Sequence, residues 1–169
     1  METMTVEIIR GPAIERRSAI PIVGIRVVTP FKGMLRIRDE LLSELHAWTR
    51  QSAIDVVGYG FLRLHVIDMK GDMDIEVGLV TSAPVSHEGR VRSGVLPAGR
   101  YATLRYRGAG TNANRELNEW ALAKGIALDH WCVPEGDQFA CRYEAYLTDP
   151  NVEPRKKQWD IELAFKVID

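Results

Sequence analysis

A glutamate next to tyrosines is the residue of this sequence best suited to bind a charged partner. Glu144 lies in the run RYEAYL at 142–147, where alternation of period two predicts a strand. Glu144 would point to the same side of that strand as Arg142 and Tyr146. The carboxylate either faces water or pairs with a positive group. The pattern alone favours water, because an antiparallel sheet can leave one face solvated.

Few other residues suggest chemistry. His65 could act as a base, but a lone histidine is more often hydrogen-bonded or on the surface. No serine or cysteine has a nucleophile motif around it, and the glycines lack phosphate-loop spacing. Tyr59 lies between two glycines, which permit a bulge that re-aims a side chain. Trp131 would either form a pocket wall or cover the edge of a sheet.

Composition indicates an ordinary globular protein. The chain has 169 residues, 46% of them hydrophobic and 27% charged, with a net charge of −1. Direct binding to nucleic acid or membrane is not expected, since it needs a basic excess. The N-terminus has no signal-peptide pattern, and no apolar run could span a membrane, so we expect a cytoplasmic protein. Cys132 and Cys141 lack metal-site spacing, which predicts reduced thiols and no metal or cofactor.

The chain repeats itself, which indicates two similar halves. Leu45 and Trp48 match Leu117 and Trp120 at a constant offset, and two further segment pairs follow in the same order. The three matched pairs are SELHAWTRQSAI at 43–54 with RELNEWALAKGI at 115–126, HVID at 65–68 with AYLTD at 145–149, and MDIEVGLV at 73–80 with WDIELAFKV at 159–167.

Each half is predicted to hold one helix, near 38–51 and near 112–124, with Gly125 ending the second. Trp48 and Trp120 lie on the apolar stripes and should be mostly buried. Strands are predicted at 6–10, 20–28, 58–68, 73–80, 91–96, 100–106, 139–149 and 159–167. One helix per half predicts an α+β fold with both helices on one face of an antiparallel sheet.

Strand alternation predicts which side chains lie away from the helices. Leu62, Leu64 and Val66 would pack on the helices, as would Ile161 and Leu163. The opposite face would carry Phe61, Arg63, His65, Glu76, Arg142, Glu144, Tyr146 and Glu162.

The order of three segments resembles the GyrI-like small-molecule-binding domain, also called the AraC-type or bacterial transcription-activator effector-binding domain. The segments are LPAGRYATLRYRGAG at 96–110, RYEAYLTDP at 142–150 and WDIELAFKV at 159–167. The resemblance implies a single domain with pseudo-twofold symmetry, in which strand-helix-strand-strand halves at about 1–85 and 86–169 share a curved antiparallel sheet.

The resemblance also implies a ligand site. In that family a groove between the halves takes hydrophobic, often cationic, compounds, and an acidic residue of the penultimate strand, matched by Glu144, lies in it. The implied ligand-binding residues are Glu144, Tyr146, Phe61, Arg63, Tyr59, Trp131 and Glu162. By the repeat Arg63 is the counterpart of Glu144, and its guanidinium would neutralise the acid, in which case a neutral or amphipathic ligand would fit better.

Three functions follow from the resemblance. The first, which we expect, is a stand-alone binding module without a catalytic residue, which senses or sequesters a hydrophobic or amphipathic compound. The second is a hydrolase of strained electrophilic toxins, with Glu144 as general base. The third is a protein–protein modulator such as a gyrase inhibitor. The repeat leaves no helix-turn-helix segment, so transcription control would need a separate DNA-binding protein.

Overall fold

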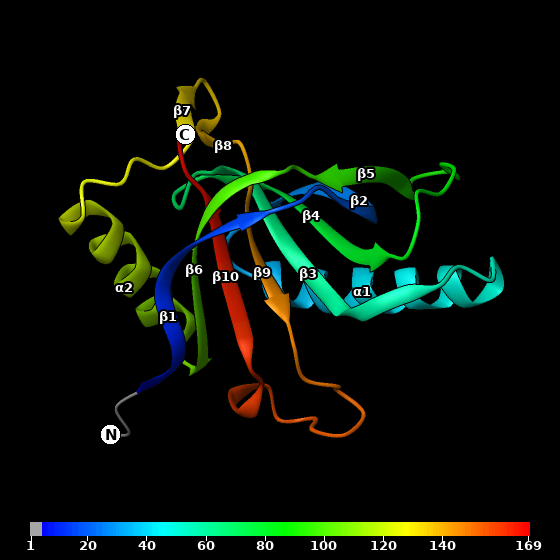
Figure 1. The fold of residues 1–169 in the computed structure, drawn as a ribbon. Helices are drawn as coiled ribbons and strands as arrows, with labels where there is room; N and C mark the ends of the chain where they lie inside the picture. Colours follow the sequence, from blue (N-terminus) through cyan, green and yellow to red (C-terminus); the bar gives the residue numbers. More distant parts are fainter. Residues whose placement is uncertain (1–4) are drawn as a thin grey trace.

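The computed structural model describes residues 5–169, which form two α-helices, one short 3-10 helix (η1) and ten strands (Figure 1). The elements are β1 (Val6–Arg17), β2 (Ile20–Pro30), α1 (Met34–Gln51), β3 (Val56–Ile67), β4 (Asp72–Thr81), β5 (Arg92–Leu96), β6 (Gly99–Gly108), α2 (Gly110–Ala123), β7 (His130–Val133), β8 (Gly136–Phe139), β9 (Arg142–Tyr146), η1 (Lys156–Gln158) and β10 (Ile161–Lys166). Both predicted helices are present, and Gly125, with a φ of 69°, follows the second.

The strands form one antiparallel sheet with a symmetric order. The order is β1-β6-β10-β9-β3-β4-β2-β5, and exchanging equivalent strands of the two halves reverses it. The halves meet where β9 pairs with β3. They also exchange their first strands, since β1 pairs with β6 of the second half and β5 pairs with β2 of the first. The predicted α+β fold of two related halves is therefore confirmed.

Both helices pack on the same face of the sheet, which we call the helix face. Leu45 on α1 and Leu117 on α2 are both fully buried in the core beneath them. Trp48 and Trp120 are only partly buried, but both pack against this core. The helix registers predicted from the repeat are therefore right, although the two tryptophans are less buried than expected.

The other face, called the opposite face below, has a core of its own. Phe61, Tyr101 and Tyr143 are buried there, together with Ile22 and Leu96 from the far end of the strand order. Side chains from strands at the two ends of the order can meet only because the sheet curves strongly around this face. The expectation that this face is solvated is wrong.

Two local features differ from or refine the predicted strands. A register shift between Val57 and Phe61 interrupts β3, where Gly58 and Gly60 both have positive φ, so the predicted bulge is present. The strand predicted at 139–149 is two strands, because β8 ends at Phe139 and β9 begins at Arg142. β7 and β8 form a hairpin that extends the sheet beside β3. No helix within residues 5–169 is long and apolar enough to cross a membrane.

Candidate functional site

Glu144 lies on the helix face, not on the opposite face where the alternation placed it. Its direct neighbours across the two adjacent strands are Leu62 and Leu163, which are buried in the core beneath the helices. Residues paired in this way share a face of the sheet. Tyr146 is 3% exposed in the same core, and Arg142 follows the same alternation. The predicted face of these three β9 residues is therefore wrong.

The helix-face side chains of β9 connect the two helices. At one end of the strand, the Arg142 Nη2 donates a 3.0 Å hydrogen bond to the Asn114 Oδ1 on α2. At the other end, the Tyr146 hydroxyl accepts a 3.1 Å hydrogen bond from the Arg38 Nη1 on α1. Glu144 lies between Arg142 and Tyr146 along β9, the strand that pairs with β3 where the two halves meet.

Arg38 is the most buried cation near the acid, with 4% of its surface exposed. Its guanidinium carbon lies 5.0 Å from the centroid of the Tyr146 ring, at cation–π distance. The Nε and Nη2 of Arg38 contact Asp39 Oδ1 at 3.0 and 2.9 Å, and Asp39 in turn pairs with Lys156. Within residues 5–169 no ion pair of 4.0 Å or less joins Arg38 to Glu144. Asp39 and Tyr146 accept the hydrogen bonds of Arg38, and the acid is left with a longer-range attraction to its charge.

Burial dominates the electrostatics of the site. It raises the pKa of Glu144, while the charge of Arg38, a hydrogen bond with Tyr146 and the charge of Arg142 act in the other direction. Burial also lowers the pKa of Arg142 to about 10. The pKa of Tyr106, which is 2% exposed, is raised by burial and by the nearby Glu144 charge. Glu144 is half-buried as a whole residue, and its carboxyl group lies among two tyrosines and two arginines.

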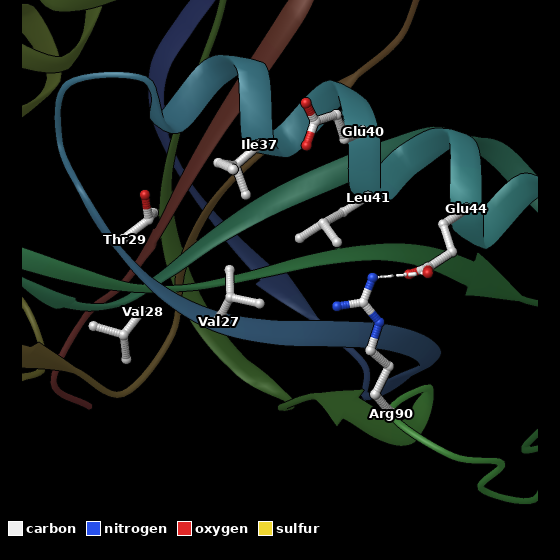
Figure 2. Close-up of a pocket in the computed structure, with 8 residues that line it drawn as sticks. All are labelled: Val27, Val28, Thr29, Ile37, Glu40, Leu41, Glu44 and Arg90. Atoms are coloured by element: carbon white, nitrogen blue, oxygen red, sulfur yellow. Dashed lines mark hydrogen bonds and ion pairs between the residues drawn. The ribbon is translucent and has the colours of Figure 1, made fainter.

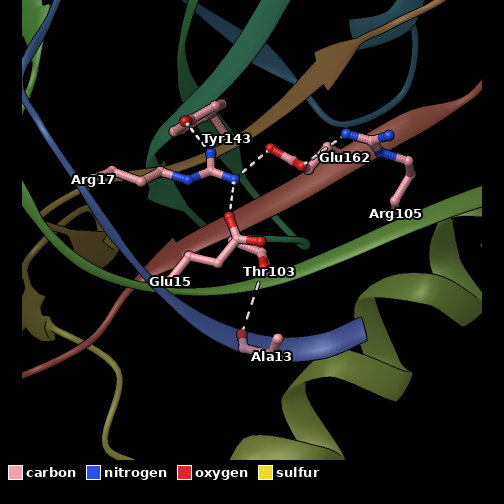
Figure 3. Close-up of polar contacts among 7 residues, drawn as sticks. All are labelled: Ala13, Glu15, Arg17, Thr103, Arg105, Tyr143 and Glu162. Carbon is pink, nitrogen blue, oxygen red and sulfur yellow. Dashed lines mark hydrogen bonds and ion pairs between the residues drawn. The ribbon is translucent and has the colours of Figure 1, made fainter. Parts of the chain in front are cut away.

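Glu162 belongs to a separate polar network on the opposite face (Figure 3). Its carboxylate contacts the Arg17 Nη2 at 2.6 Å and the Arg105 Nη2 at 3.6 Å. Arg17 also contacts Glu15 at 2.8 Å and donates a 2.9 Å hydrogen bond to the Tyr143 hydroxyl. Glu162 therefore lies on the other side of the sheet from Glu144, and the structure does not bring the two acids together. Two guanidinium groups pair with Glu162 there.

Phe61 and Arg63 also lie on the opposite face. Phe61 is 1% exposed, and its ring meets the Tyr143 ring edge-on with centroids 6.0 Å apart. The Arg63 Nη2 donates a 2.8 Å hydrogen bond to the Ala140 carbonyl oxygen, and Arg63 pairs across the sheet with Tyr143 rather than with Glu144. The predicted neutralisation of Glu144 by Arg63 is therefore corrected: the nearby guanidinium groups on the helix face are those of Arg38 and Arg142.

The remaining predicted residues are more exposed. Tyr59 is 38% exposed beside the bulge of β3. Trp131 is 46% exposed in the β7–β8 hairpin, where it pairs with Gln138. His65 is hydrogen-bonded, as expected of a lone histidine, with its Nε2 2.8 Å from Glu76 Oε1.

A pocket of about 410 Å³ lies away from this acid, between α1 and β2 (Figure 2). Its lining residues are Val27, Val28, Thr29, Ile37, Glu40, Leu41, Glu44 and Arg90. The Arg90 side chain reaches up to α1 and pairs with Glu44 at 2.6 Å. None of the residues predicted to bind a ligand lines this pocket.

Two members of the site were missed from the sequence. Arg38 carries a usable signal, because it precedes Leu41 by three residues and Leu45 by seven and so falls on the apolar stripe of α1. Tyr106 follows Leu104 by two residues, which places both on one face of β6. A charged residue on an apolar stripe needs a buried partner, which here is Tyr146 on β9.

The family model of the GyrI-like small molecule binding domain matches residues 11–168, which include both helices and every residue of the site described above. The chain belongs to this family. The resemblance found in the sequence is therefore confirmed, and the protein is a GyrI-like small-molecule-binding domain. A comparison with curated protein sequences finds no match.

Several solved structures have a similar fold. The EcmrR C-terminal domain aligns over 99% of both chains, with 17% identity and a TM-score of 0.72. The EcmrR chain in the EcmrR–DNA complex aligns with 97% of this chain, at 16% identity and a TM-score of 0.72. This chain spans only 57% of the length of that EcmrR chain. SAV2435 bound to tetraphenylphosphonium aligns over 92% of this chain and 93% of its own, with 12% identity and a TM-score of 0.56. A hydrolase from Listeria innocua aligns over 94% and 92%, with 12% identity and a TM-score of 0.60. At these identities the likeness shows the fold alone.

Proposed function

We propose that this GyrI-like domain senses or sequesters a hydrophobic small molecule, which binds on the helix face around Glu144. The observation that carries the proposal is a carboxyl group with a pKa raised by burial, placed on the strand that connects the two helices. A buried carboxylate costs several kcal/mol, by order of magnitude, unless a partner compensates it. A ligand that contacts the acid would recover part of that cost.

The ligand's other contacts would come from the surrounding core. Tyr106 and Tyr146 place aromatic rings and hydroxyl groups beside the acid, and Leu62 and Leu163 are its apolar neighbours across the sheet. All four are at most 3% exposed, so a ligand contacts them only by displacing the side chains that cover them. Such a site binds mainly through apolar contact, and a few polar groups set orientation. SAV2435, which shares the fold, has been solved bound to tetraphenylphosphonium, a hydrophobic cation. A ligand of this general kind is therefore a sensible first probe.

The test is the variant Glu144→Gln, which keeps the shape of the side chain and removes its charge. We expect the affinity for tetraphenylphosphonium to fall roughly tenfold or more, because ~1.4 kcal/mol of lost charge pairing is a factor of ten. Binding of a neutral dye such as Nile red should change little. Titration calorimetry and dye fluorescence measure the two effects.

Glu40→Gln is the matched control for this test, because Glu40 is an exposed acid on α1. It removes the same charge and should leave both affinities unchanged. If neither probe binds the unaltered chain, or if Glu144→Gln and Glu40→Gln behave alike, the proposed site is wrong.

A hydrolase is the second candidate, and the raised pKa of Glu144 is the observation that favours it. A carboxylate with a higher pKa is a stronger base toward water. With a strained, cyclopropane-bearing electrophile as substrate, Glu144→Gln should abolish turnover and leave substrate binding largely intact. Equal turnover by the two proteins would exclude Glu144 as the base.

Control of transcription would need a second protein in this proposal. In the EcmrR–DNA complex the matched chain is longer than this one, which covers 57% of it. By analogy, this domain would act on DNA through a separate DNA-binding protein, or act on a protein such as gyrase. Gel-shift assays with the domain alone should show no DNA binding.

A further inference from the structure

The position that a cationic ligand would take beside Glu144 is already occupied by a cation of the chain. The Arg38 guanidinium stacks on the Tyr146 ring at 5.0 Å and donates to its hydroxyl at 3.1 Å. It is 4% exposed, and its charge acts on Glu144. An aromatic face beside a carboxylate is the usual recognition site for an organic cation. In this chain α1 supplies that cation itself.

We propose that Arg38 is an internal counter-cation that sets ligand specificity: it disfavours permanently cationic ligands and directs the site to neutral or anionic hydrophobic compounds. This inference rests on the proposed function, since it concerns the ligand of the same site. Arg38 is a specificity-determining residue in it, not a catalytic one.

The charges around the site support this specificity. Facing the acid are Arg38 from α1 and Arg142 from β9, two positive charges against one carboxyl group. Asp39 also pairs with Arg38, but it is 40% exposed and is shared with Lys156. A second cation brought beside Glu144 would meet like charge at short range, where screening by solvent is weak. It would otherwise have to displace Arg38 from both Tyr146 and Asp39.

Two probes of the same shape and opposite charge test the inference directly. Tetraphenylphosphonium and tetraphenylborate have nearly the same size, so apolar contact contributes similarly to the binding of both. The unaltered chain should bind the borate more tightly than the phosphonium. In Arg38→Met, which keeps an apolar side chain of similar length, the phosphonium affinity should rise at least tenfold and the borate affinity should fall, so that the preference reverses.

Arg36→Met is the matched control, because Arg36 lies two residues away on α1 and is 75% exposed. It makes the same change in net charge and should leave the ratio of the two affinities unchanged. A change in that ratio as large as in Arg38→Met would mean that net charge, not the position of Arg38, sets the preference, and would overturn the inference.

Arg38→Gln provides a second variant and a readout without ligand. Glutamine can still donate a hydrogen bond to Tyr146 and lacks the charge. The pKa of Glu144, followed by NMR, should rise in Arg38→Gln because a positive charge that lowers it is lost. A purely structural role of Arg38 would leave this pKa unchanged in a folded variant, and that result would overturn the inference.

The outcomes separate this inference from the proposed function. If Glu144→Gln weakens phosphonium binding but Arg38→Met changes both probe affinities in the same direction, the site stands and the role of Arg38 falls. If no variant binds either probe, the proposed function fails and takes the inference with it.

Discussion

At the scale of single residues, Glu144 is unusual because Arg38, the cation that acts on it most strongly, donates its hydrogen bonds to other groups. Arg38 directs its hydrogen bonds to Asp39 and Tyr146, so Tyr146 stands between the guanidinium and the acid in the network. The acid therefore bears the cost of burial with only partial compensation, which is why its pKa is raised. Glu162 shows the contrast, since two arginines on the opposite face pair with it directly.

The raised pKa of Glu144 predicts a pH dependence of stability. The folded protein holds the proton more tightly than the unfolded chain, whose carboxyl group titrates near 4.5. The cost of ionising Glu144 is absent below that pH and is fully present above the folded pKa. Glu144→Gln should therefore be more stable than the unaltered chain at pH 7, and the difference should shrink toward pH 4. Each tenfold difference in proton affinity corresponds to about 1.4 kcal/mol.

Urea denaturation at a series of pH values from 4 to 8 measures this difference. Glu40→Gln is again the control, because the exposed acid should give no pH-dependent difference from the unaltered chain. The opposite result would be a Glu144→Gln protein that is less stable than the unaltered chain at pH 7, with a difference that shrinks toward pH 4. That result would show that the native state stabilises the ionised acid.

At the scale of elements, the two helices occupy equivalent places, and their buried leucines should contribute similarly. Leu45 and Leu117 are matched by the repeat, and both are fully buried beneath the helices. Leu45→Ala and Leu117→Ala should each lower the free energy of unfolding by about 2–5 kcal/mol, because each leaves a cavity. Leu122→Ala, at a position 81% exposed on α2, is the control and should cost little. Chemical denaturation measures all three; a loss below ~1 kcal/mol at either buried site would contradict the equivalence.

The helices were predictable because their apolar stripes repeat, whereas the face of β9 was not. The run RYEAY places a tyrosine on each side of the strand, so its alternation does not identify the buried face. The face is set by the partners of Glu144, which are Leu62 and Leu163. A pairing register that slips by one residue transfers every side chain to the other face. Aligning Glu144 with Arg63 in the repeat introduced such a one-residue shift, and it assigned Glu144 to the wrong face of the sheet.

At the scale of the whole molecule, the symmetry explains why the acid is single. Both helices lie on one face of the sheet, so the pseudo-twofold rotation that relates the halves maps each face onto itself. The counterpart of Glu144 on β3 is therefore a helix-face residue. The helix-face residues on either side of Arg63 are Leu62 and Leu64, so Arg63 is not that counterpart. The second half contributes a carboxyl group where the first contributes an apolar side chain. Duplication thus predicted the architecture, while the site lies where the two halves differ.

The exchange of first strands predicts that neither half folds alone. A cut between Val85 and Ser86 lies in the segment that joins β4 to β5, outside the named strands. Residues 1–85 would keep β1 without its partner β6, and residues 86–169 would keep β5 without β2. Each half would also expose the edge at which β3 and β9 pair, and unpaired edges favour aggregation.

Circular dichroism should show little native structure in either half, and refolding the two together should restore a single complex of 169 residues by gel filtration. The intact chain is the control, and a half that folds as a stable monomer would show that the exchanged strands are not needed.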